Sequence, residues 1–85
     1  MSFVYVLKSG NVEWYYVGST EDLEVRVKTH NSGGVRSTKS KRPLTLVYYE
    51  KLDDITEARR REKQIKLQRI LKEKIIKNLA SSSNG

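Results

Sequence analysis

Residues 21–31 combine helical periodicity with two side chains that could do chemistry. Leu23 and Val27 mark the face of this segment that is expected to be buried, and Arg26 and His30 lie at the edge of that face. Because Arg26 and His30 are four residues apart, they are neighbours on one side of a helix. A guanidinium can bind a phosphate and an imidazole can carry a proton. The alternatives are an arginine that reaches past the core to solvent and a histidine that simply favours a helix C-terminus.

Glu62 interrupts a second apolar stripe. Ile55, Ala58 and Ile65 mark the buried face of the later helical segment, and Glu62 falls inside it. Carboxylates are almost never fully buried without a partner. One interpretation is a salt bridge to one of the arginines on the same helix. The other is a ligand for a hard cation such as Mg²⁺, which prefers carboxylate oxygen.

Strands are needed to position these groups, and aromatic and β-branched residues predict three of them, over residues 3–7, 14–17 and 44–49. Gly10 and Asn11 predict a two-residue turn between the first two strands. Pairing about that turn places Tyr5 opposite Tyr16, so both phenols emerge on the same side of the sheet. The alternative is that aromatic residues in strands are ordinary core or cross-strand residues, as we expect for Tyr15, Tyr48 and Tyr49.

The remaining segments predict helices. Ser19 or Thr20 is expected to cap a helix that ends near Asn31, and Asp53 or Asp54 a second helix. Helical periodicity continues to about residue 79, and we expect a break near residues 68–69 because a single helix of that length is unusual in a small domain. The predicted fold is a small α/β (α+β) domain. Its mainly antiparallel, three-stranded sheet is flanked by three helices, in the order β-β-α-β-α-α.

Length and composition narrow the protein class. Eighty-five residues with no cysteine predict one domain, residues 1–79, followed by a flexible tail, residues 80–85, and they exclude a disulfide framework and a thiolate zinc site. No apolar run approaches the roughly 20 residues needed to span a bilayer, and the N-terminus does not resemble a signal peptide. We therefore expect a cytoplasmic protein with no membrane partner.

Charge is distributed unevenly along the chain. Residues 1–34 carry three Lys or Arg and four Asp or Glu, whereas residues 35–85 carry fourteen and six. This asymmetry predicts a polyanionic partner, and nucleic acid is the first candidate because neutralised phosphates release counterions. The alternative is a basic surface that only keeps the protein soluble.

Five sequence motifs, in this order and at compact spacing, are together more specific than any one alone. They are Phe3-Val4-Tyr5, Tyr16-Val17-Gly18, residues 22–33 around Arg26, residues 42–48, and residues 58–66 around Glu62. Together they resemble the GIY-YIG endonuclease superfamily over about residues 2–67, especially its small stand-alone bacterial members. The nuclease domain of the excinuclease C subunit is a more distant relative. The first motif departs from the family pattern, because Phe3 replaces its glycine.

The resemblance implies a metal-dependent endonuclease that hydrolyses phosphodiester bonds in DNA, in repair or recombination. Tyr5 resembles the general base, Tyr16 a residue that orients water or phosphate, and Arg26 the group that binds the phosphate. Glu62 resembles the ligand of one Mg²⁺ or Mn²⁺ ion, and His30 is expected to share the proton path or bind phosphate. Gly18 resembles the glycine that leaves room for close backbone approach.

A basic loop is expected to hold the nucleic-acid backbone without reading its sequence. The residues assigned to it are Arg36, Thr38, Lys39, Lys41 and Arg42. We expect a monomer rather than a dimer, and a protein partner for targeting. Two alternatives stay open: a nucleic-acid-binding module of the same fold with little catalytic activity, and a protein-interaction module whose basic face meets an acidic partner.

Overall fold

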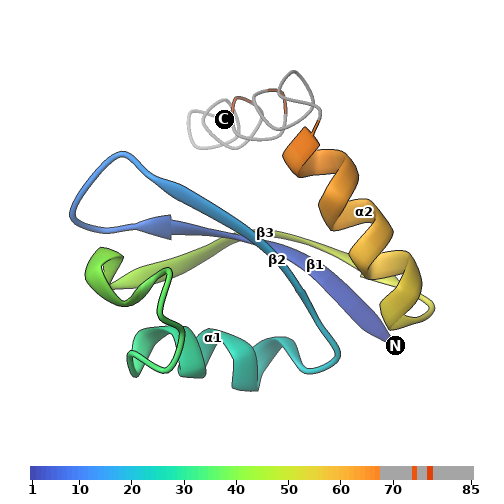
Figure 1. The fold of residues 1–85 in the computed structure, drawn as a ribbon, viewed down its shortest axis with the longest axis horizontal. Coiled ribbons are helices and arrows are strands. Elements are labelled where there is room, and N and C mark those ends of the chain that lie inside the picture. The colour runs from blue at the N-terminus through green and yellow to red at the C-terminus, as the bar shows by residue number, and fades with distance from the viewer. Residues whose placement is uncertain (68–73, 75–76, 78–85) are drawn as a thin grey trace, which may run out of the picture.

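The computed structural model describes residues 1–67, 74 and 77. Its elements follow the predicted order strand, strand, helix, strand, helix (Figure 1). They are β1 (Ser2–Ser9), β2 (Tyr15–Thr20), α1 (Leu23–Asn31), the 3₁₀ turn η1 (Lys39–Lys41), β3 (Leu44–Leu52) and α2 (Ile55–Leu67). The three strands and the first two helices are confirmed. The third predicted helix, the expected break near residues 68–69 and the tail at 80–85 lie outside the described residues.

The sheet is fully antiparallel in the order β2-β1-β3, and β1 is its central strand. Because side chains alternate along a strand, β1 contributes to a core on each face of the sheet. Val4 and Val6 pack with Ala58 and Ile65 of α2 on one face. On the other face, Tyr5, Leu7 and Leu44 form a second core with α1, through Leu23 and Val27. The two helices therefore cover opposite faces of the sheet, which explains the uninterrupted apolar run in β1.

The predicted register of the β1–β2 hairpin is wrong by two residues. Leu7 pairs with Tyr16, and Tyr5 pairs with Gly18 rather than with Tyr16. The turn is longer than two residues because the Ser9 hydroxyl accepts hydrogen bonds from two backbone amides of the loop, at 3.1 and 3.3 Å, while Ser9 N donates to the carbonyl of Trp14. A shift of two residues keeps every side chain on its face. Tyr5 and Tyr16 are therefore diagonal neighbours on the same side.

The helix caps are partly as predicted. Asp22, rather than Ser19 or Thr20, caps α1, because its side chain accepts a hydrogen bond from Val25 N at 3.1 Å. Ser19 and Thr20 are instead the last residues of β2. Asp54 does cap the start of α2, accepting from Glu57 N at 2.9 Å. Among the described residues, no helix is long and apolar enough to cross a membrane.

Candidate active site

The site begins with the two phenols that the hairpin places on the α1 face of the sheet. The ring centroids of Tyr5 and Tyr16 are 6.3 Å apart, and the Tyr5 side chain is completely buried. Gly18, opposite Tyr5 on β2, provides the room: a Cβ atom there would lie 2.5 Å from the Tyr5 hydroxyl and 2.9 Å from the Tyr16 ring. The space at Gly18 is thus filled by the Tyr5 phenol, not by an approaching backbone as the sequence suggested.

Helix α1 supplies two further groups from one side. Arg26 Nε donates to the Tyr5 hydroxyl at 3.4 Å, and His30 Nε2 lies 2.9 Å from the same oxygen. The His30 ring also packs against Tyr16, with centroids 5.0 Å apart. The spacing of four residues predicts that the two side chains lie on one side of the helix, and the structure shows that both reach the Tyr5 hydroxyl.

Electrostatics keep these groups in definite protonation states. Burial raises the pKa of Tyr5 above 10, and the hydrogen bond from Arg26 opposes that rise only in part. Burial, together with the charge of Arg26, lowers the pKa of His30 to about 4. At neutral pH the free protein therefore holds a protonated phenol next to a neutral imidazole. Neither group carries a buried charge before a proton moves, and the imidazole is placed to accept the proton of the phenol.

Glu62 approaches β2, the strand of Tyr16 and Gly18, from the other face of the sheet. It lies on α2 and is partly buried, with 21% of its side chain exposed. Ser19, which follows Val17 on the α2 face of β2, donates to Glu62 Oε1 at 2.5 Å. Lys66, one helical turn later, donates to Glu62 Oε2 at 2.5 Å, and its ammonium lies 5.7 Å from the centroid of the Tyr16 ring.

The two halves of the site meet at the β2 edge of the sheet. Lys66 links them, because it touches the Glu62 carboxylate and also faces the Tyr16 phenol. The negative charge of Glu62 contributes to the raised pKa of Tyr5, so the carboxylate acts electrostatically on the α1 side as well. Arg26 and Glu62 are thus not on remote surfaces, although they do not contact each other directly.

The oxygen atoms around Glu62 fit a weak Mg²⁺ or Mn²⁺ site. A carboxylate and a hydroxyl are the hard donors such ions prefer, and Mg²⁺ commonly takes one or two carboxylates with water and substrate phosphate. A cation already occupies the position, since the Lys66 ammonium is bound there. Within the described part of the chain, no three His, Cys, Asp or Glu side chains gather into a metal cluster. Ligation would therefore rest on Glu62, with Ser19 beside it.

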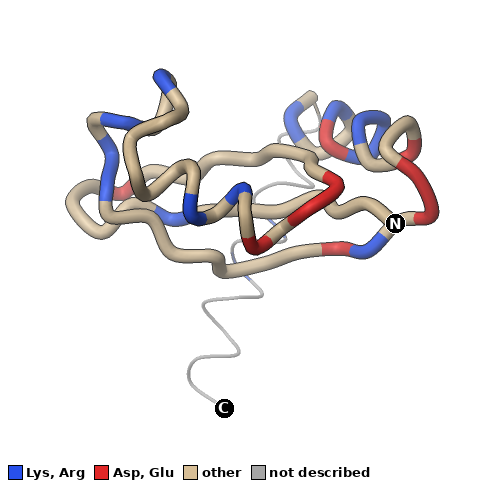
Figure 2. The backbone as a smooth tube through the Cα atoms, turned by 90° about the horizontal axis from the view of Figure 1, so that it is seen from below, with Lys and Arg blue, Asp and Glu red and all other residues tan. Residues whose placement is uncertain are grey.

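The basic loop between α1 and β3 borders this site. Lys and Arg recur along it and along α2 (Figure 2). Arg36 and Lys39 are exposed. Lys41 is partly buried, with its ammonium 5.6 Å from the centroid of the Trp14 ring, which stacks on Tyr16. Arg42 is partly engaged, because its Nε donates to the Lys39 carbonyl at 2.9 Å.

Thr38 does not share the exposure of this basic loop. Its side chain is completely buried, and its hydroxyl lies 2.8 Å from His30 Nδ1. The hydroxyl is directed at the site histidine and away from the exposed residues of the loop, so the expected contact of Thr38 with a nucleic-acid backbone does not fit its position. The loop instead turns this residue inward, onto the histidine of the site.

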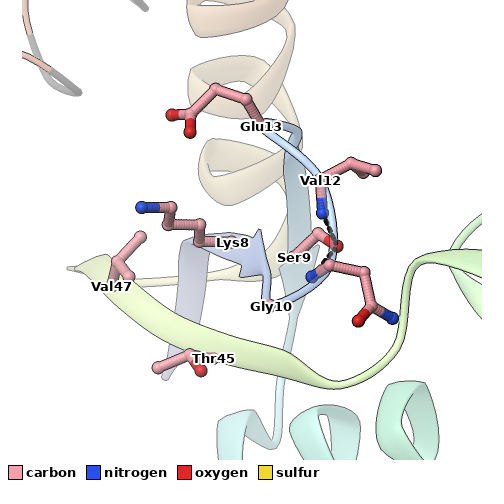
Figure 3. Close-up of a pocket in the computed structure, with 8 residues that line it drawn as sticks. Lys8, Ser9, Gly10, Val12, Glu13, Thr45 and Val47 are labelled. Atoms are coloured by element: carbon pink, nitrogen blue, oxygen red, sulfur yellow. Dashed lines mark hydrogen bonds between the residues drawn. The ribbon is translucent and has the colours of Figure 1, made fainter.

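The hairpin loop forms a separate hollow of about 440 Å³ (Figure 3). It is lined by residues 8–13 together with Thr45 and Val47. The Ser9 hydroxyl bonds that lengthen the loop are visible there, and the same hydroxyl donates to the Lys41 carbonyl at 2.7 Å. None of the predicted site residues lines this hollow. The hydrogen bond from Ser9 to Lys41 fastens the hairpin to the basic loop.

Three supporting residues were not predicted from the sequence. Ser19 could have been found from strand alternation with Val17, and Lys66 from its spacing of four residues from Glu62. Asn31 gives no such signal. Its side-chain amide both donates to the carbonyl and accepts from the amide of Leu44, at 2.9 and 2.7 Å, and so ties the end of α1 to the start of β3.

Comparison with known proteins defines the class. The family model described as the GIY-YIG catalytic domain matches residues 1–81. The chain belongs to this family, and its membership supports a nuclease role.

The similar proteins are small members of that family. The UPF0213 protein SH2523 of Staphylococcus haemolyticus is 43% identical over 65 residues, which cover 75% of this chain and 78% of that protein. The UPF0213 protein CPE1444 of Clostridium perfringens is 43% identical over 67 residues, covering 78% and 71%. The solution NMR structure of the UPF0213 protein BH0048 from Bacillus halodurans is 32% identical, with a TM-score of 0.55 and coverage of 91% and 84%.

Proposed function

We propose that this protein is a divalent-metal-dependent endonuclease that hydrolyses phosphodiester bonds in DNA, in repair or recombination. The observation that carries the proposal is the convergence of Arg26 and His30 on the Tyr5 hydroxyl, next to β2, whose other face carries Ser19 in contact with Glu62 of α2. A structural core has no need of an arginine and a histidine on one buried hydroxyl. The basic loop next to the site supports an anionic substrate.

The geometry supports a proton relay. A water molecule attacks phosphorus and forms the new P–O bond, while the P–O bond to the leaving oxygen breaks. The Tyr5 hydroxyl is completely buried in this structure, so the step requires the site to open enough for water to reach it. The attacking water then gives a proton to the Tyr5 oxygen as Tyr5 passes its own proton to His30 Nε2, 2.9 Å away. Arg26 holds the phosphate and counters the charge that develops on it, and Tyr16 orients the water or the phosphate. His30 is thereby the acceptor of the water proton and Tyr5 the relay, while the leaving oxygen keeps the bonding electron pair and takes a proton from solvent to become a free hydroxyl.

Glu62 would hold one Mg²⁺ or Mn²⁺ ion, with the Ser19 hydroxyl at its side. When bound, such an ion polarises the phosphoryl group and stabilises the departing oxygen. Lys66 would have to move from the carboxylate to admit it.

The occupied carboxylate favours one alternative. Both oxygens of Glu62 have partners within the protein, Ser19 and Lys66, as would suit a nucleic-acid-binding module with little activity. Cleavage of single-stranded, duplex and branched DNA, measured with and without Mg²⁺, separates the two functions. Binding with no metal-dependent cleavage of any of these substrates would establish the binding module.

Glu62→Ala tests the metal-ligand assignment. We expect Mg²⁺-dependent cleavage to fall by about 10²–10³-fold, because charge stabilisation in the transition state is lost. The free energy of unfolding should change by less than about 1 kcal/mol, since the Lys66 ion pair is partly exposed. Glu57→Ala is the matched control, an exposed glutamate in the first turn of the same helix, and it should cleave normally. A Glu62→Ala protein that cleaves at the wild-type rate excludes Glu62 as the ligand.

A further inference from the structure

Thr38 is a buried polar residue whose position the proposed mechanism leaves unexplained. Its hydroxyl lies 2.8 Å from His30 Nδ1 and 3.3 Å from the Val35 carbonyl oxygen, which also accepts from Thr38 N. Thr38 therefore extends the row of contacts Arg26, Tyr5, His30 by one more group. Each hydroxyl in this row carries one proton, and the neutral imidazole carries a proton on only one of its two nitrogens. The possible arrangements of donors and acceptors can therefore be compared one by one.

One placement satisfies every atom. Thr38 donates its hydroxyl proton to the Val35 carbonyl, which can only accept, and its oxygen accepts from His30 Nδ1–H. His30 Nε2 then carries a lone pair and accepts the Tyr5 proton, while the Tyr5 oxygen accepts from Arg26 Nε–H. All donors in the row point the same way, from the guanidinium to the backbone carbonyl.

The opposite tautomer leaves a buried proton without an acceptor. If Thr38 donated to Nδ1, then His30 Nε2–H would donate to the Tyr5 oxygen, which Arg26 Nε also approaches. The Tyr5 hydroxyl proton would then find no acceptor among its contacts in the described residues, although the side chain is completely buried. Leaving a buried donor unsatisfied costs about 1–3 kcal/mol.

We propose that Thr38 is a positioning residue that fixes His30 in the Nδ1–H tautomer, so that Nε2 faces the Tyr5 hydroxyl as a proton acceptor. In many enzymes a catalytic base is likewise oriented by a third group, which forms a hydrogen bond to the side of the base that faces away from the reacting atom. The catalytic consequence rests on the proposed nuclease function, whereas the tautomer itself does not.

Histidine-selective ¹⁵N labelling tests the tautomer directly, because His30 is the only histidine in the chain. At pH 7, where the ring is neutral, the wild-type spectrum should show Nδ1 protonated and Nε2 bare. Thr38→Val removes the hydroxyl at nearly constant shape and should move the ring toward the Nε2–H form or a mixture. Thr38→Ser restores the hydroxyl and should restore the wild-type pattern. A wild-type ring protonated on Nε2 overturns the proposal, whether or not any variant folds.

Cleavage of the best DNA substrate gives the second measurement. Thr38→Val should lower kcat by about 10–100-fold with little change in KM, and Thr38→Ser should recover most of the loss. Thr45→Val, at an exposed threonine of β3, is the matched control and should change neither the tautomer nor kcat. If Thr38→Val keeps the wild-type tautomer, the positioning role is wrong. If the tautomer behaves as expected but wild-type protein cleaves no DNA, the nuclease function is wrong and the tautomer assignment stands.

Discussion

At the residue scale, Tyr5 shows how a buried phenol can take part in proton transfer without becoming a stable phenolate. Burial and the charge of Glu62 raise its pKa, and the hydrogen bond from Arg26 lowers it by less. A proton removed from Tyr5 must therefore be taken up at once. His30 is suited to this, because it is neutral, in contact, and held away from bulk water.

Gly18→Ala should displace the Tyr5 phenol. The added Cβ would lie 2.5 Å from the Tyr5 hydroxyl and 2.6 Å from Cζ, so the ring or strand β2 must shift. We expect the free energy of unfolding to fall by about 1–3 kcal/mol, as in other overpacked cores, and cleavage to fall as well. Urea unfolding and single-turnover cleavage measure the two effects.

A double-mutant cycle locates the collision. Tyr5→Phe removes the nearer of the two atoms, so Gly18→Ala should destabilise the Tyr5→Phe protein less than the wild type, while Cζ leaves part of the cost. Equal costs in both backgrounds would show that the Tyr5 hydroxyl is not what Gly18 accommodates.

At the element scale, α2 is held to the sheet by an ion pair between Arg61 and Glu50 of β3. Arg61 Nε and a terminal guanidinium nitrogen donate to the two oxygens of Glu50 on β3, at 2.8 and 3.0 Å. Tyr48 donates to the same carboxylate at 2.5 Å, and burial with this contact raises the pKa of Tyr48 to about 12. The bidentate pair fixes the rotation of α2, and with it the direction in which Glu62 points.

Arg61→Ala should lower the free energy of unfolding by about 1–2 kcal/mol at pH 7, since the pair is bidentate and mostly shielded from solvent. The Arg61 guanidinium holds the pKa of Glu50 below its ordinary value of 4.5. The stabilisation is therefore fully present above about pH 4.5 and is lost as the pH falls through the lower folded-state pKa. Chemical unfolding of both proteins across this pH range measures it.

The matched control for that variant is Arg60→Ala, an exposed arginine next to Arg61 on the same helix. It should change stability by no more than about 0.5 kcal/mol, independently of pH. Equal destabilisation by both variants would mean that the Glu50 pair contributes nothing specific.

Sequence periodicity predicted the helices and strands better than it predicted the register between strands and the contacts between elements. Spacing placed Arg26 and His30 on one helix side and predicted α2 with Asp54 at its cap, because these are properties of single segments. The hairpin register depended on the Ser9 hydroxyl binding amides of its own loop, which competes with a two-residue turn. The inward turn of Thr38 depended on His30, eight residues away, and no local pattern contains that contact.

At the scale of the whole molecule, positive charge should guide the substrate to the β2 edge. Lys39 lies in the basic loop that borders the site, and it is exposed. Lys39→Ala should reduce the slope of log K against log salt by about 1 for duplex DNA, with similar weakening for all sequences. Binding titrations without divalent metal, from low to physiological salt, give the slope.

Lys51→Ala is the control of equal charge. Lys51 is exposed on β3, the edge strand on the other side of β1. This variant should leave the slope almost unchanged. If both variants change it equally, DNA is held by net charge alone and has no preferred face.

The division of the site between two faces of a three-stranded sheet has a mechanical consequence. Tyr5, Arg26 and His30 move with one face and Glu62 with the other, so their separation is set by how strongly the strands coil about one another. The register between β1 and β3 shifts at a bulge between Val6 and Leu7, and this bulge helps to set that coiling. Reshaping the bulge would open or close the gap between carboxylate and guanidinium while the contacts within each half survive. Catalytic rate should therefore respond to sheet curvature well before melting temperature does.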